Sequence, residues 1–206
     1  MADFQIERKF FRQGLTAIAG IDEVGRGALF GPVVAAAVIV PAKVIKKNHP
    51  QWVKEIRDSK LLTPLNRRRL AAIILAEATS IGIGVASNQE IDQKNIYWAS
   101  LEAMKRAVQN LSLTPDILLV DGFILKDVNY LQKGIPQGDR RCVSIAAASI
   151  VAKVLRDEMM VLLDKIFEGF GLSRNKGYGT REHYRALAEL GPTPFHRRTF
   201  NLKLKS

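Results

Sequence analysis

The stretch TAIAGIDEVGRGALFGPVVAAAVIV, residues 16–40, carries the clearest structural pattern in the chain. Its first part, residues 16–21, is small and mostly apolar, and residues 33–40 form a run of alanines and β-branched residues. Both runs are typical of strands. Between them lies EVGRGALFGP, whose glycines and proline are typical of a tight connection. The stretch therefore predicts a strand, a turn and a second strand.

Helices and further strands follow along the chain. Thr63 and Pro64 have the form of an N-cap and a first helical residue for a helix over 65–78. Ser87 with Glu90 three residues later has the form of a capping box that opens a helix towards Leu111. We also expect strands over 81–86 and 117–120, an irregular stretch over 126–139, one or two helices over 144–170, a loop over 175–180, and a helix over 181–190 that Thr180 caps. This alternation predicts an α/β fold with a mixed β-sheet flanked by α-helices.

Length and composition limit the class of protein. A chain of 206 residues, 47% of them hydrophobic, fits one domain, and we expect its C-terminal part from about residue 165 to be helical. The longest apolar runs end before the roughly 18 residues of a membrane span, and the N-terminus does not have the form of a secretory signal. The single cysteine, Cys142, excludes an internal disulfide and a cysteine metal site. We expect a cytoplasmic monomer with no membrane partner.

The chain is strongly basic, with 31 Lys and Arg against 20 Asp and Glu and a net charge of +11. Such a charge attracts polyanions and favours nucleic acid as a partner. Ribosomal proteins and many basic enzymes share this property, so the charge alone does not separate binding from catalysis. Basic residues are concentrated over 181–206, which indicates a binding face.

Four acidic residues are candidates for catalysis. Asp22 and Glu23 end the first strand, Asp121 follows an apolar strand, and Asp139 precedes an alanine-rich helix. Each is also compatible with a solvated turn. If the four converge, their repulsion raises their pKa values unless cations neutralise them. Oxygen ligands favour Mg²⁺ or Mn²⁺, and two such ions about 3.5–4 Å apart suit phosphodiester hydrolysis.

Other residues are candidates for substrate binding. The turn Gly25-Arg26-Gly27 can present N–H groups and a charge to a phosphate or a sugar hydroxyl, or it is merely a tight connection. Tyr178, between two glycines, has the form of a stacking platform or of an ordinary packing residue.

Three further polar pairs or sets carry weaker signals. Ser59 and Lys60 can supply a hydroxyl and an ammonium to a phosphate, or they only precede the next helix. Ser149 and Lys153, four residues apart, share a helix face that faces the acids or the solvent. The histidines, at positions 49, 183 and 196, show no metal-binding spacing, and we assign them no catalytic role.

Taken together, these strings resemble the bacterial ribonuclease HII family. The resemblance covers nearly the whole chain and rests on the following segments: GIDEVGRG at 20–27, DSKLL from 58, EID at 90–92 with NI at 95–96, LLVDG at 118–122, GD at 138–139, IAAASIVAKVLRD at 145–157, NKGYGT at 175–180 and HRRTF at 196–200. It implies a ribonuclease H-like fold with a C-terminal helical extension. It also implies a metal-dependent endoribonuclease that hydrolyses the RNA strand of RNA–DNA hybrids.

The same resemblance implies a mechanism and roles for individual residues. The enzyme would incise 5′ to ribonucleotides embedded in duplex DNA by a two-metal-ion mechanism that leaves 3′-hydroxyl and 5′-phosphate ends. This activity belongs to ribonucleotide excision repair and DNA replication, with recruiting partners that the sequence does not identify. The metal ligands would be the four acids, Asp22, Glu23, Asp121 and Asp139. The glycine turn would sense the 2′-hydroxyl, Tyr178 would pack on the sugar at the RNA-to-DNA junction, and Ser59, Lys60 and Lys153 would support the active site.

One departure from the family pattern concerns the turn. Ala28 and Phe30 stand where the family commonly has Pro and Ala, and we expect the change to affect packing beneath the turn more than chemistry. Two other functions remain open from the residues alone. A non-catalytic nucleic-acid-binding protein would share the charge, although clustered acids would oppose binding. A resolvase or integrase of similar fold would share the carboxylates and cut DNA that lacks ribonucleotides.

Overall fold

The computed structural model describes residues 2–46, 50–56 and 62–203. In this part of the chain the centre is a mixed sheet with the strand order β3-β2-β1-β4-β5. The strands are β1 (Ile18–Val24), β2 (Val33–Ile39), β3 (Ser80–Ala86), β4 (Ile117–Asp121) and β5 (Gln132–Ile135). The first three pair antiparallel, whereas β1 with β4 and β4 with β5 pair parallel.

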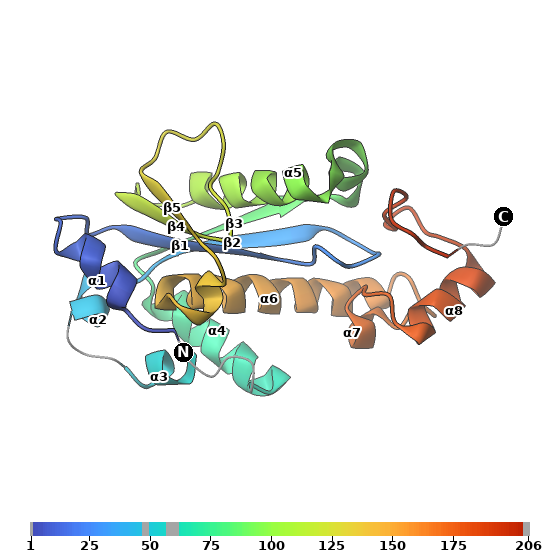
Figure 1. The fold of residues 1–206 in the computed structure, drawn as a ribbon. Coiled ribbons are helices and arrows are strands. Elements are labelled where there is room, and N and C mark those ends of the chain that lie inside the picture. Colours follow the sequence, from blue (N-terminus) through green and yellow to red (C-terminus); the bar gives the residue numbers. More distant parts are fainter. Residues whose placement is uncertain (1, 47–49, 57–61, 204–206) are drawn as a thin grey trace.

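Helices cover both faces of this sheet (Figure 1). They are α1 (Gln5–Phe11), α2 (Ala42–Lys46), α3 (Gln51–Ile56), α4 (Pro64–Glu77), α5 (Asn88–Gln109), α6 (Val143–Asp164), α7 (Leu172–Asn175) and α8 (Arg181–Leu190), with a short 3₁₀ helix, η2 (Gly138–Arg140). Helix α5 packs on one face, and α6, backed by α4, packs on the other. The predicted α/β architecture is confirmed.

The predicted helix starts are where the sequence signals placed them. The hydroxyl of Thr63 accepts a hydrogen bond from the backbone N–H of Asn66, and Pro64 opens α4. Ser87 and Glu90 form a reciprocal capping box at the start of α5. Thr180 caps α8 as Thr63 caps α4, because its hydroxyl accepts a hydrogen bond from the backbone N–H of His183.

Burial on both faces explains the composition of the central strands. All seven residues of β2, VVAAAVI, are buried, because α5 and α6 cover its two sides. A glycine in β1 allows the closest of these contacts. A Cβ on Gly20 would lie 2.1 Å from the backbone carbonyl carbon of Ser144, so only glycine lets the start of α6 approach the strand this closely.

The structure departs from the sequence predictions in several regions. Helices α1, α2 and α3 were not predicted, and α6 ends at Asp164, whereas helix was expected as far as residue 170. Residues 126–139 are not irregular throughout, because β5 and η2 lie within them. Beyond α6, the short helix α7 and helix α8 form a separate apolar cluster with the end of α6 and with Leu29 and Phe30 (Figure 1). Among the described residues, no helix combines the length and the apolar character needed to cross a membrane.

Candidate active site

Three of the four candidate acids lie at the carboxyl ends of two neighbouring parallel strands, and the fourth, Asp139, lies in η2 beside them. Ile21 of β1 pairs with Val120 of β4, so Asp22 and Asp121 occupy the next position on each strand. The backbone N–H of Gly138, in η2, donates to Asp121 Oδ1 at 2.6 Å, which brings Asp139 beside Asp121. The structure therefore gathers acids that are 117 residues apart in the chain, from 22 to 139, at one end of the sheet.

Burial and mutual repulsion disfavour the charged forms of these acids. Burial raises the pKa of Asp22 well above its usual value, and the neighbouring charges of Glu23 and Asp121 add to this effect. Burial also raises the pKa of Glu23, although Arg26 opposes the shift, and burial raises the pKa of Asp121. The protein's own cations therefore do not compensate the cluster, and added positive charge would favour its ionised form.

The carboxylate oxygens are only partly satisfied by the protein. Glu23 Oε1 accepts from Arg26 at 3.1 Å, and Asp22 Oδ1 accepts from the N–H of Glu23 at 2.8 Å. Glu23 Oε2 is buried and has no hydrogen-bond partner. Such an orphaned oxygen in a set of hard oxygen donors fits a divalent cation. Across the described residues, however, no three His, Cys, Asp or Glu side chains are already arranged around one point, so a cation would compete with the protein donors for these oxygens.

The turn Gly25-Arg26-Gly27 follows the acids directly and depends on glycine. Gly25 has φ +94°, and a Cβ there would lie 2.1 Å from Nε of the buried Arg156. Arg197 holds the turn from below, because its guanidinium donates to the carbonyls of Gly25 and Arg26, each at 2.8 Å. The turn therefore has a fixed backbone beside the acid cluster.

Two fully buried arginines form this support, and the sequence analysis missed both. Arg197 also donates to the carbonyl of Gly31, and Arg156 donates to the carbonyls of Pro32, Phe30 and Lys176. Burial lowers the pKa of both guanidinium groups, and neither forms an ion pair with a carboxylate of the described chain. We call Arg156 and Arg197 the arginine clamp, since they join the turn to the loop that carries Tyr178.

Tyr178 lies beside the glycine turn, as its proposed role requires. It pairs with Ala28 in an antiparallel bridge, and the N–H of Leu29 donates to the carbonyl of Gly177 at 2.8 Å. A Cβ on Gly27 would lie 4.0 Å from Tyr178 Cε1, so the ring lines the open side of the turn. The ring is half-buried, with the guanidinium of Arg156 5.5 Å from its centre.

Two histidines that looked scattered in the sequence meet behind Tyr178. The N–H of Thr193 donates to His196 Nδ1 at 2.9 Å, so a neutral His196 carries its proton on Nε2. That proton points at His183 Nε2, 3.0 Å away, and His183 Nδ1 in turn donates to the carbonyl of Tyr178 at 3.0 Å. Burial lowers the pKa of both rings, that of His196 to about 4. Both imidazoles are therefore neutral at neutral pH, and each donates its single N–H in these hydrogen bonds.

The remaining candidates differ in how they lie relative to the acid cluster. Ser149 hydrogen-bonds to Asp22 and lowers its pKa, so it touches the acid cluster. Lys153 pairs with Asp157 at 2.8 Å, with its ammonium 6.0 Å from the centre of the Tyr178 ring. Ser59 and Lys60 lie outside the described residues.

Phe30 packs beneath the turn, as its departure from the family pattern suggested. The side chain is fully buried. Its ring stacks on Phe195 at 5.8 Å and meets the edges of Phe167 and His196 at 5.6 and 4.9 Å. Phe30 is thus part of the apolar cluster under the turn.

Fold and site together define a class of protein. A mixed sheet with helices on both faces, with acids at the ends of adjacent parallel strands, is the ribonuclease H-like arrangement, and solved structures confirm the fold. The ribonuclease H2 of Pyrococcus horikoshii OT3 superposes with a TM-score of 0.73 at 25% identity, over 90% of this chain and 94% of that one.

Comparison of sequences identifies the family within this class. The model of the Ribonuclease HII family matches residues 19–203, and the chain belongs to this family of hydrolases. It is 50% identical over 194 residues to the ribonuclease HII of Moorella thermoacetica, which covers 94% of this chain and 91% of the relative. The ribonuclease HII of Dehalococcoides mccartyi strain 195 is 47% identical over 94% of this chain and 90% of its own.

Proposed function

We propose that this member of the ribonuclease HII family hydrolyses the RNA strand of RNA–DNA hybrids and also incises duplex DNA 5′ to an embedded ribonucleotide. The products would carry 3′-hydroxyl and 5′-phosphate ends. Asp22, Glu23, Asp121 and Asp139 would hold two divalent cations, Mg²⁺ or Mn²⁺. Recruitment by replication or repair proteins, a cytoplasmic location, a monomeric state and a single domain with a helical C-terminal portion stay predictions.

One observation carries the proposal: two of the acids, Asp22 and Glu23, share one short segment of chain with the glycine turn. Glu23 and Gly25 are two residues apart, so a nucleotide whose sugar contacts the turn has its phosphate next to the acids. The 2′-hydroxyl is the group that distinguishes ribose from deoxyribose. A rigid backbone turn can therefore test for this hydroxyl at the place where the cut is made.

Each part of the site has a separate task in this proposal. Bound cations would lower the pKa of water and neutralise charge on the phosphate and on the departing 3′ oxygen. The orphaned Oε2 of Glu23 and the oxygens of Asp22 and Asp121 would hold them, and Ser149 would orient Asp22. The arginine clamp would hold the turn at a fixed position relative to the acids. The Tyr178 ring would contact the sugar from the side opposite the turn.

A cleavage assay tests the function directly. The substrates are a DNA duplex with one embedded ribonucleotide, a long RNA–DNA hybrid and an all-DNA duplex, each with Mg²⁺, Mn²⁺ or EDTA. We expect cleavage of the first two, none of the third and none in EDTA, with the incision mapped 5′ to the ribonucleotide. Cutting of all-DNA duplex would instead favour a resolvase-like enzyme, and no cleavage with either metal would refute the proposal.

An acid variant separates chemistry from binding. Asp121→Asn should abolish cleavage while substrate affinity stays within a few-fold, because the basic surface supplies most of the affinity. Glu189→Gln, an exposed carboxylate on α8, is the matched charge control and should cleave like the parent. An equal loss of binding and cleavage in Asp121→Asn would contradict this division of tasks.

A further inference from the structure

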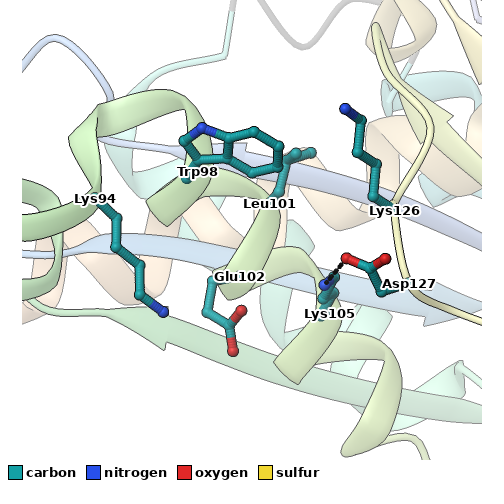
Figure 2. Close-up of a pocket in the computed structure, with 7 residues that line it drawn as sticks. All are labelled: Lys94, Trp98, Leu101, Glu102, Lys105, Lys126 and Asp127. Carbon is teal, nitrogen blue, oxygen red and sulfur yellow. Dashed lines mark hydrogen bonds and ion pairs between the residues drawn. The ribbon is translucent and has the colours of Figure 1, made fainter.

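A second surface lies next to the active site on the α5 side of the sheet. It surrounds a hollow of about 250 Å³ between α5 and the loop that follows β4 (Figure 2). The hollow is lined by Lys94, Trp98, Leu101, Glu102, Lys105, Lys126 and Asp127. We call Lys94, Trp98 and Lys126 the Trp98 surface, and none of the candidate acids belongs to it.

Cations outnumber carboxylates around the hollow, which leaves a net positive surface. Asp127 pairs with Lys105 at 3.5 Å, the contact drawn dashed in Figure 2. Glu102 lies 3.5 Å from Arg106, whose guanidinium also pairs with Glu90 at 2.6 Å, so four cations stand against three carboxylates. In the part of the chain that the structure describes, the two ammonium groups of the Trp98 surface form no ion pair. They are available to an anionic ligand.

Trp98 provides an apolar plane between these two charges. Its side chain is 41% exposed, and the Lys126 ammonium lies 5.1 Å from the centre of the ring. Figure 2 shows Lys126 beside the indole and Lys94 on its other side, with the Lys94 ammonium directed towards Glu102. An exposed aromatic ring flanked by lysines suits a ligand that repeats anionic groups and flat or apolar groups, as a sugar–phosphate backbone does.

Ring contacts make this surface continuous with the glycine turn. The guanidinium of Arg26 lies 5.3 Å from the centre of the Phe123 ring. Phe123 meets the Tyr97 ring edge-on at 5.6 Å, and Tyr97 meets Trp98 at 5.2 Å. Phe123 also follows the candidate ligand Asp121 by two residues in the same loop. A nucleic-acid strand that contacts the glycine turn can therefore extend along these rings to Trp98.

We propose that the Trp98 surface binds the sugar–phosphate backbone of the substrate duplex on one flank of the cleaved bond. The ammonium groups of Lys94 and Lys126 contact phosphates, and the indole packs against a sugar. This inference rests on the proposed function for its substrate. A protein ligand on the same surface would not give the salt dependence that contacts with phosphates produce.

Binding as a function of salt tests the proposal with matched double variants. The site variant is Lys94→Gln with Lys126→Gln, and the control is Lys43→Gln with Lys54→Gln, exposed lysines on the other side of the sheet (Figure 1). The ligand is a duplex of about 30 base pairs with one ribonucleotide, because that length extends past both flanks of a bound domain. Anisotropy of a labelled duplex gives the affinity at each salt concentration.

The expected results distinguish the site from general charge. The site variant should reduce the slope of log affinity against log salt by about 2 and weaken binding about tenfold in about 0.1 M salt, whereas the control should keep the parental slope. Trp98→Ala should weaken binding about fivefold or more without changing the slope. Duplexes shortened stepwise from each end should lose these differences on one side only, the side that reaches the surface.

Contrary results would bear separately on the Trp98 surface and on the proposed function. A parental slope in the site variant, or an equal change in the control, overturns the proposal and leaves the surface to a ligand of another class, such as a protein. These measurements need binding only, so they stand whether or not the duplex is cut. Failure of the parent to cleave would refute the proposed function, and the binding data would still decide the role of Trp98.

Discussion

Replacing Arg197 by methionine removes three hydrogen bonds at the base of the glycine turn, two from buried carbonyls and one from the part-buried carbonyl of Arg26. The guanidinium donates to the carbonyls of Gly25, Arg26 and Gly31 at 2.8–3.0 Å, and the side chain is fully buried. A buried carbonyl that loses its donor costs roughly 1–3 kcal/mol. Relief from burying a charge without a carboxylate partner offsets part of this loss. We expect the free energy of unfolding to fall by about 3 kcal/mol.

Urea unfolding followed by circular dichroism measures this change, with Arg198→Met as the control. Arg198 is exposed, so its loss should alter the free energy of unfolding by about 0.5 kcal/mol or less. Arg197→Lys keeps the charge without the planar fork, and we expect it to be destabilised nearly as much as the methionine variant. Cleavage at a single ribonucleotide should fall at least tenfold in both Arg197 variants, at a temperature where they are folded.

A small effect would refute this reasoning. If Arg197→Met unfolds within about 1 kcal/mol of the parent, the three carbonyls are satisfied in another way and the clamp is not needed for stability. If Arg197→Lys retains parental stability and cleavage, the charge matters and the directed hydrogen bonds do not.

Three further predictions follow from other parts of the structure. Gly25→Ala should lower the free energy of unfolding by more than about 2 kcal/mol in thermal melts, because φ +94° and a Cβ 2.1 Å from Arg156 both oppose alanine; parental stability would contradict this. Burial raises the pKa of Glu7 to about 7, so the folded state holds this proton more tightly than the unfolded chain. The contribution of this bound proton to the free energy of unfolding is fully present below about pH 4.5 and is lost as the pH rises through 7. The loss is about 3 kcal/mol. In urea titrations with EDTA, Glu7→Gln should remove this part of the pH dependence, and an unchanged profile would exclude Glu7 as its source. Tyr178→Ala should reduce cleavage at a single ribonucleotide more than it reduces duplex affinity, and an equal effect on single-ribonucleotide and long-hybrid substrates would argue against a role at the junction.

The fold was predictable where local signals and burial agree. The apolar run over 33–40 and the caps at Thr63 and Ser87 each specify an element without help from distant residues, and the structure has each of them. Strand β5, QKGI, was not predicted because it is a short, polar strand at the edge of the described sheet, where it pairs with β4. Its position depends on pairing with β4, and this pairing produces no periodic pattern in the sequence of β5.

The site was predictable in its acids and less so in its support. Strand ends and the family resemblance pointed to Asp22 and Asp121, whereas a buried arginine on a helix is hard to distinguish from a surface one. One signal was available, since Arg156 lies at helical spacing between the buried Ala152 and Met160. The pair of His183 and His196 had no such signal, because thirteen residues and a helix end separate them.

The proposed function requires that the acids at the ends of β1 and β4 bind divalent cations, which a titration with Mn²⁺ followed by electron paramagnetic resonance measures. We predict saturable binding to the parent that Mg²⁺ displaces, weakened at least about tenfold in Asp22→Asn and in Asp121→Asn. Parental Mn²⁺ affinity in both variants, or no saturable binding to the parent, would contradict the proposed function.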